Sequence, residues 1–178
     1  MSEHLEHEAT DTANGELDST RDVSDQLISL KGSRRPMHLR HLIFGWALVL
    51  SSTIVGVTLE ALHGFKMGWY LDVGNEIRRL MLTLGHGHGT LLGIVNLVFA
   101  AHLSSVKDWP SRSRDFASRC LMVASLLIPG GFLLGGIHIY DGDPGLGIML
   151  VPIGALAFIT MLIVTLRAAI RQPWSPEA

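Results

Sequence analysis

Four long apolar runs separated by short polar segments occupy the chain from residue 42 onward, at 42–59, 80–106, 120–140 and 144–166. Each run contains no Asp, Glu, Lys or Arg and reaches, or nearly reaches, the roughly 20 residues that a helix needs to cross a bilayer. The runs lack the apolar and polar alternation of barrel strands. They predict an all-α integral membrane four-helix bundle, with helices over residues 41–62, 79–104, 117–140 and 145–168.

Composition and charge divide the chain into a membrane domain and two polar tails. Hydrophobic residues make up 48% of the chain and charged residues 17%, which is typical of a membrane protein. The first 30 residues contain eight acidic residues, one Arg and no apolar core, so they predict a disordered tail and not a cleavable signal peptide. We expect residues 1–36 to form this acidic cytoplasmic tail with a basic collar, residues 37–172 the transmembrane domain, and residues 173–178 a short C-terminal tail.

Lys and Arg residues are distributed unequally between the two sides of the predicted helices. Three of them, Lys66, Arg78 and Arg79, fall in the loop between the first two helices. Ten lie on the opposite side, and positive residues concentrate in cytoplasmic loops. We therefore expect a multi-pass protein of the bacterial inner membrane with both termini in the cytoplasm. The ten residues are Lys31, Arg34, Arg35, Arg40, Lys107, Arg112, Arg114, Arg119, Arg167 and Arg171.

In an α-helix each residue is rotated by about 100° from the one before it. With this rotation, small and polar residues form a stripe along each of the first three predicted helices. Glycine stripes allow helix backbones to approach closely in lipid. We expect these stripes to face the interior of the bundle. They comprise Gly45, Ser52, Gly56, Glu60 and His63 in the first helix, Gly85, Gly89, Gly93 and Asn96 in the second, and Gly131, Gly135 and His138 in the third.

The connection between the third and fourth helices is a short turn sequence, Asp-Gly-Asp-Pro-Gly at 141–145. Gly, Pro and Asp each favour turn conformations. A tight antiparallel hairpin of these two helices is predicted.

Four histidines and one glutamate are expected to converge near the outer side of the bundle. They are Glu60 and His63 at the end of the first helix, His86 and His88 in the second, and His138 at the end of the third. Ionisable groups at membrane depth face the interior and usually find partners. This layer is therefore the candidate functional site.

Imidazoles and a carboxylate are suitable ligands for a transition metal such as iron, copper or zinc. All five residues of the layer are metal-ligand candidates, and Glu60 and His63 have the spacing found in di-iron bundles, although the other carboxylates of such a centre are missing. Two imidazoles on facing helices can also ligate haem iron. His88 and His138 are the candidates for haem b.

A structural role is the alternative for these histidines, because histidines in glycine-rich interfaces can simply hydrogen-bond helices together. His38, His41 and His102 are interpreted as residues of the inner membrane boundary. No nucleophile with a base partner stands out among Ser51, Ser52, Thr53 and Cys120, so enzymatic catalysis is not expected. The positive residues lie at the membrane edges and imply no nucleic-acid partner.

Four short motifs resemble those of small four-span bacterial membrane proteins of the YgdD and YwdK type, a family of unknown function. They are Leu62-His63-Gly64-Phe65-Lys66, the segment 88–93 (His-Gly-Thr-Leu-Leu-Gly), the Gly-rich third helix, and Val151-Pro152-Ile153-Gly154-Ala155. The long acidic tail and the doubled histidine of the second helix depart from that family. The resemblance implies the four-helix architecture and no activity.

Three functional hypotheses follow from the sequence. The first is a membrane protein that binds a metal or haem at the outer site, with a role in electron transfer. The second is a non-catalytic accessory or assembly subunit, whose glycine stripes pack against partner subunits or a second copy of the chain. The third is a conduit for protons or small solutes. The lipid bilayer is the surrounding partner in all three.

Overall fold

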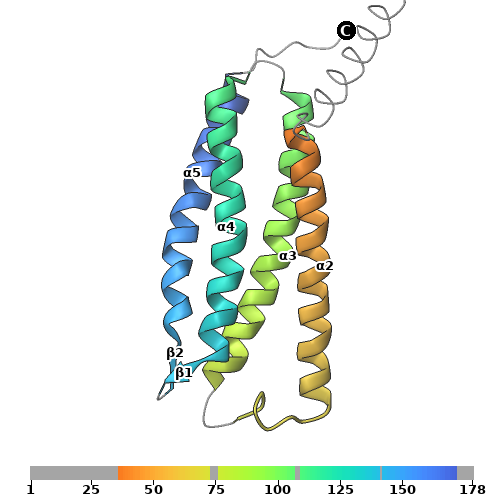
Figure 1. The fold of residues 1–178 in the computed structure, drawn as a ribbon, viewed down its shortest axis with the longest axis vertical. Coiled ribbons are helices and arrows are strands. Elements are labelled where there is room, and N and C mark those ends of the chain that lie inside the picture. Colours follow the sequence, from red (N-terminus) through yellow and green to blue (C-terminus); the bar gives the residue numbers. More distant parts are fainter. Residues whose placement is uncertain (1–35, 73–75, 107–108, 141, 172–178) are drawn as a thin grey trace, which may run out of the picture. The chain divides into compact units, whose positions relative to one another are not determined.

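The computed structural model describes residues 36–72, 76–106, 109–140 and 142–171, and within them the chain forms four long helices (Figure 1). Each is long and apolar enough to cross a membrane, so the predicted all-α four-helix fold is confirmed. The predicted tails, residues 1–36 and 173–178, lie outside the described residues except for Pro36. The helices are α2 (Met37–Gly64), α3 (Glu76–Ser105), α4 (Ser111–Ile137) and α5 (Leu150–Ile170), the last preceded by the 3-10 helix η1 (Leu146–Met149).

Three of the helices, α2, α3 and α4, begin earlier than the hydropathy pattern predicts, whereas α5 begins later, after the 3-10 helix η1. α2 and α4 start directly after Pro36 and Pro110, because proline disfavours helical backbone at the residue before it and tolerates the start of a helix. Their first turns are polar and extend beyond the apolar run. Hydropathy therefore locates the apolar part of a helix but does not detect polar first turns such as these.

Each helix packs mainly on its neighbour in the sequence, so that α3 and α4 lie at the centre and α2 and α5 at the two sides (Figure 1). In the most apolar stretch of each helix, 39% of α3 and 44% of α4 is buried, against 17% of α2 and 11% of α5. The exposed faces of α2 and α5 are rich in Leu, Ile and Val. Such faces are suited to lipid contact.

Glycines bring the helix backbones together, as predicted from the stripes. A Cβ at Gly45 of α2 would lie 2.9 Å from the carbonyl oxygen of Gly93 in α3. On the other side of the bundle, a Cβ at Gly154 of α5 would lie 3.1 Å from the backbone nitrogen of Ile128 in α4. These contacts leave no room for side chains, so the glycines fix how closely the helices approach.

The connection between α4 and α5 contains two short strands that the sequence did not predict, β1 (Ile139–Tyr140) and β2 (Asp143–Pro144). They pair antiparallel, with Ile139 opposite Pro144 and Tyr140 opposite Asp143. The predicted tight hairpin is confirmed. Gly142 lies in the turn at a φ of 92°, a conformation that glycine adopts without steric cost.

Replacing Gly142 with Ala is expected to lower the free energy of unfolding by about 1 kcal/mol, because a Cβ disfavours this backbone conformation. Nothing lies within 4 Å of the added atom, so the backbone alone determines the effect. Chemical unfolding in mild detergent measures it. Gly64→Ala is the control: Gly64 also has open space around it and ends a helix, and a loss of more than about 0.5 kcal/mol there would contradict the explanation.

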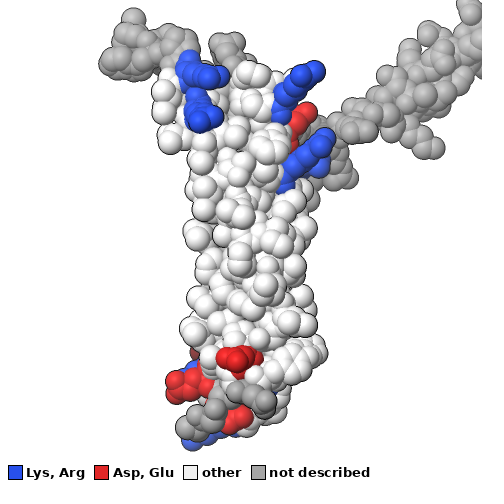
Figure 2. Space-filling model, turned by 90° about the vertical axis from the view of Figure 1, so that its left-hand side faces the viewer, with Lys and Arg blue, Asp and Glu red and all other residues white. Residues whose placement is uncertain are grey.

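Charged side chains gather at the two ends of the helices and leave an uncharged belt between them (Figure 2). We call the two ends the Arg40 end and the hairpin end. The described positive residues at the Arg40 end are Arg40, Arg112, Arg114, Arg119, Arg167 and Arg171. Those at the hairpin end are Lys66, Arg78 and Arg79, accompanied by Glu60, Asp72, Glu76 and Asp143.

Candidate functional site

The five candidate ligands predicted from the sequence do not form one cluster. Glu60 and His63 of α2 are exposed, although the stripe placed them in the interior. Glu60 lines an open groove between α2 and α3. The His63 ring packs edge-on to Tyr70, at 6.5 Å between centroids. His138 is exposed directly after α4, where the backbone is already extended. The prediction that these three face the interior is therefore wrong.

His88 lies apart from His138, its predicted partner as a haem ligand. The Nδ1–H of His88 donates to the carbonyl oxygen of Leu84 at 2.8 Å, and its ring lies 4.9 Å from that of Phe132 in α4. Phe132 precedes His138 by six residues, or about 9 Å of helix. The two histidines thus lie at different levels of the bundle, and this placement does not support the predicted haem pair.

The described residues contain no group of three or more His, Cys, Asp and Glu side chains placed to hold a metal ion. Of the five candidates, only Glu60 and His86 line the same groove. The predicted metal site therefore lacks an assembled ligand set in this part of the chain.

His86 crosses from α3 to α2. Its Nδ1–H donates to the backbone carbonyl oxygen of Ser52 at 2.7 Å, and its ring fills the space that Gly56 leaves open, because a Cβ there would lie 2.5 Å from the ring. With the proton on Nδ1, the Nε2 atom of the neutral ring is an acceptor. Gly56, a residue of the predicted stripe, thus leaves the space that the His86 imidazole occupies between α2 and α3.

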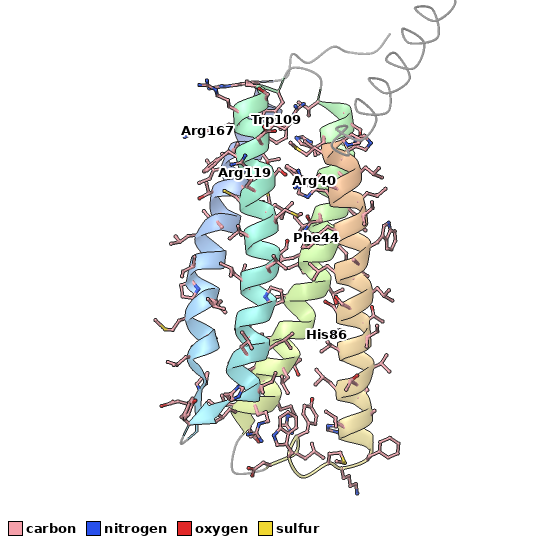
Figure 3. All side chains as sticks on the ribbon, viewed as in Figure 1. Arg40, Phe44, His86, Trp109, Arg119 and Arg167 are labelled. Atoms are coloured by element: carbon pink, nitrogen blue, oxygen red, sulfur yellow. The ribbon has the colours of Figure 1, made fainter. Side chains whose placement is uncertain are left out.

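Two cavities meet at His86, which Figure 3 shows toward the hairpin end. The first is a groove of about 740 Å³ between α2 and α3, where Glu60 and Tyr70 also form part of the wall. The second has a volume of about 240 Å³ and is lined by residues of α2, α3 and α4, among them Ser52 and Ser125. Since one water occupies about 30 Å³, the smaller cavity has room for several.

A buried polar network near the Arg40 end is the feature that sequence reasoning missed. His41 and Asn96 are 1% and 0% exposed. His41 bonds through Nδ1 to the Asn96 Oδ1 atom and through Nε2 to the Ser118 Oγ atom, both at 2.7 Å. The Nδ2 atom of Asn96 donates to Ser125 Oγ and to the Leu92 carbonyl oxygen, both at 2.8 Å.

The network fixes the proton positions on its own members. Because the Nδ2 group of Asn96 makes both donor contacts, its Oδ1 atom must accept, and His41 therefore donates from Nδ1 and accepts from Ser118 at Nε2. All the ring nitrogens and amide atoms are satisfied. His41 is buried in this network, which its interpretation as a simple interfacial histidine did not predict. Its position four residues before Gly45, on the same face of the helix, was the signal in the sequence.

The network, the two cavities and Glu60 follow one another along the helices, and we call this succession of polar side chains the polar path, although the walls between them are mainly apolar. It leads from His41 and Asn96 to Ser125, through the smaller cavity to His86, and along the groove to Glu60. His41 and Glu60 are nineteen residues apart on one continuous helix, or about 28 Å. This length is close to the roughly 30 Å of hydrocarbon in a bilayer.

Comparison of the chain with protein-family models, with curated proteins and with solved structures finds no match. The polar path is therefore the basis on which a function is proposed.

Proposed function

We propose that this small multi-pass membrane protein relays protons across the bilayer along the polar path. The observation that carries the proposal is the length of the path, which spans an apolar layer of membrane thickness between Glu60 and His41. Ionisable groups within such a layer are costly and commonly form proton relays. Because positive residues are in excess at the Arg40 end, we also propose that this end and both termini face the cytoplasm. The membrane in this proposal is the inner membrane of a bacterium.

The individual groups have distinct roles in this relay. Glu60 takes up a proton in the groove, and His86 can accept it at Nε2 because its Nδ1–H is held by Ser52. Water in the cavity of about 240 Å³ connects His86 to the hydroxyl of Ser125. His41 exchanges the proton at the Arg40 end, next to the polar first turn of α2.

Asn96 closes the path in this conformation. Its side chain separates Ser125 from His41, and an amide, unlike a hydroxyl or imidazole, does not pass a proton on readily. The relay thus conducts when the Asn96 side chain turns aside and water replaces it. A closed resting state keeps the membrane from leaking protons.

Glu60→Gln is expected to reduce proton flux at least about tenfold, a bound set below the roughly 100-fold or more that a positioned acid or base contributes. Flux is measured in proteoliposomes with a pH-sensitive dye inside and a potassium diffusion potential as the driving force. Thr58→Val is the matched control on α2, because the Thr58 hydroxyl donates to the Ile54 carbonyl oxygen and lies outside the groove.

Asn96→Ser provides an opposite change in the same assay. The shorter side chain leaves room for water, so flux is expected to rise above that of the unmodified chain. Unchanged flux in Glu60→Gln, or no flux above that of empty liposomes in any variant, would refute the relay.

The accessory-subunit hypothesis has less support. It requires the glycine stripes to be free for partner helices, whereas Gly45, Gly89 and Gly93 face atoms of this same chain. The metal or haem hypothesis lacks an assembled ligand set among the described residues. The relation to the YgdD and YwdK type of protein is likewise a proposal, based on its short motifs alone.

A further inference from the structure

The groove between α2 and α3 has the size and composition of a ligand site. Its volume of about 740 Å³ lies within the roughly 300–1,000 Å³ of typical small-molecule sites. Val57, Leu91 and Ile94 form apolar walls and are 65%, 53% and 48% exposed. These walls open on the lipid-facing side of the helix pair, so the groove is accessible to a molecule dissolved in the bilayer.

Three polar side chains of this groove have their hydrogens engaged within the protein, and the hydroxyls of Tyr70 and Thr83 also line it. Thr53 donates its hydroxyl hydrogen to the Val49 carbonyl oxygen at 2.8 Å, and Thr90 donates its own to the His86 carbonyl oxygen at 3.1 Å. Their hydroxyl oxygens keep lone pairs free to accept. The Nδ1–H of His86 is also engaged, as described above.

Charge in the groove has a single sign. Glu60 contributes a carboxylate, and no Lys or Arg is among the described residues that line the groove. Tyr70, which is 5% exposed, adds an aromatic ring, and aromatic rings attract cations. The complementary ligand is therefore a cation that donates hydrogen bonds.

We propose that the groove binds a lipophilic organic amine in its ammonium form. The ammonium group donates to the Glu60 carboxylate and the neighbouring acceptors, while the apolar body of the amine lies along Val57, Leu91 and Ile94. A small hydrophilic amine lacks this apolar contact to offset its loss of hydration. The apolar body also brings the ligand to the site through the bilayer.

Binding of the amine and uptake of a proton exclude each other at Glu60. One carboxylate balances one positive charge, which either an ammonium group or a proton supplies. Exchange of an amine for a proton taken from the relay rests on the proposed function, whereas binding itself does not.

The test is equilibrium binding to the full chain in mild detergent, with dansylcadaverine as the fluorescent amphipathic amine and with protein-free micelles subtracted. Saturable binding of one molecule per chain is expected, and Glu60→Gln is expected to weaken it at least about tenfold, the loss of roughly 1.4 kcal/mol. The N-acetylated probe, which has the same body and no charge, is expected not to saturate. Asp143→Asn removes a carboxylate at the same end but outside the groove and is expected to leave binding unchanged.

Equal binding of the charged and acetylated probes, or unchanged affinity in Glu60→Gln, would overturn the amine site. The measurement needs no gradient and no flux. Loss of the relay with intact amine binding would therefore refute only the proposed function, and flux without amine binding would refute only the site.

Discussion

Asn96→Leu is expected to lower the free energy of unfolding by roughly 2 kcal/mol. The side chain makes three buried hydrogen bonds, to His41, Ser125 and Leu92, and such bonds average about 0.6 kcal/mol each inside membrane proteins. Leucine has the same number of side-chain heavy atoms and the same branching, so the loss comes from the polar contacts and not from a cavity. A ring nitrogen of His41 is then left buried without a partner, which adds to the cost.

A double-mutant cycle separates this effect from simple misfit of leucine. In the Asn96→Leu background, His41→Phe removes the orphaned ring nitrogen and is expected to restore part of the lost stability, whereas His41→Phe alone is expected to destabilise. Unfolding by a denaturing detergent gives all four values. Additive effects of the two substitutions would show that the His41 and Asn96 bond contributes nothing.

Gly93→Val is expected to lower the free energy of unfolding by about 3 kcal/mol, the upper end of the usual cost of overpacking. A Cβ at Gly93 would lie 3.0 Å from the backbone nitrogen of Val49 and 3.1 Å from the carbonyl oxygen of Gly45. Backbone atoms cannot turn aside as side chains do. α2 and α3 must therefore separate, and the network between His41 and Asn96 separates with them.

Gly87→Val is the matched control, because it places the same side chain on the same helix. Nothing lies within 4 Å of a Cβ at Gly87, so the free energy of unfolding is expected to change by no more than about 0.5 kcal/mol. The same unfolding assay compares the two variants. Similar losses in both would mean that valine weakens α3 itself and that the close contact with α2 has no special role.

The sequence predicts the four helices and their glycine contacts well, because both depend on local properties. An apolar run of about 20 residues in a membrane protein has few alternatives to forming a helix that spans the bilayer. The residues Gly45, Gly89 and Gly93 mark a face that can only pack closely. The α4–α5 hairpin follows from its turn sequence, although the two short strands within it do not.

The meeting of the polar side chains could not be predicted in the same way. Rotation of 100° per residue places Glu60 and His63 on the face of Gly45, but it does not give the angle at which two helices cross. α2 and α3 diverge toward the hairpin end (Figure 1). Their backbones are in contact at Gly93, the His86 ring lies between them at Gly56, and a groove separates them at Glu60. The burial of His41 was missed for the converse reason. α2 and α3 remain close together where His41 lies.

Packing between sequence neighbours also has a consequence for how the chain assembles. During synthesis, each helix that enters the bilayer finds a packing partner, the preceding helix, already there, so few long loops must close before contacts form. The hydrogen bond between His41 and Ser118 is an exception, since it joins α2 to α4. The first pair of helices can thus form early, but its polar core is completed only when the third has arrived.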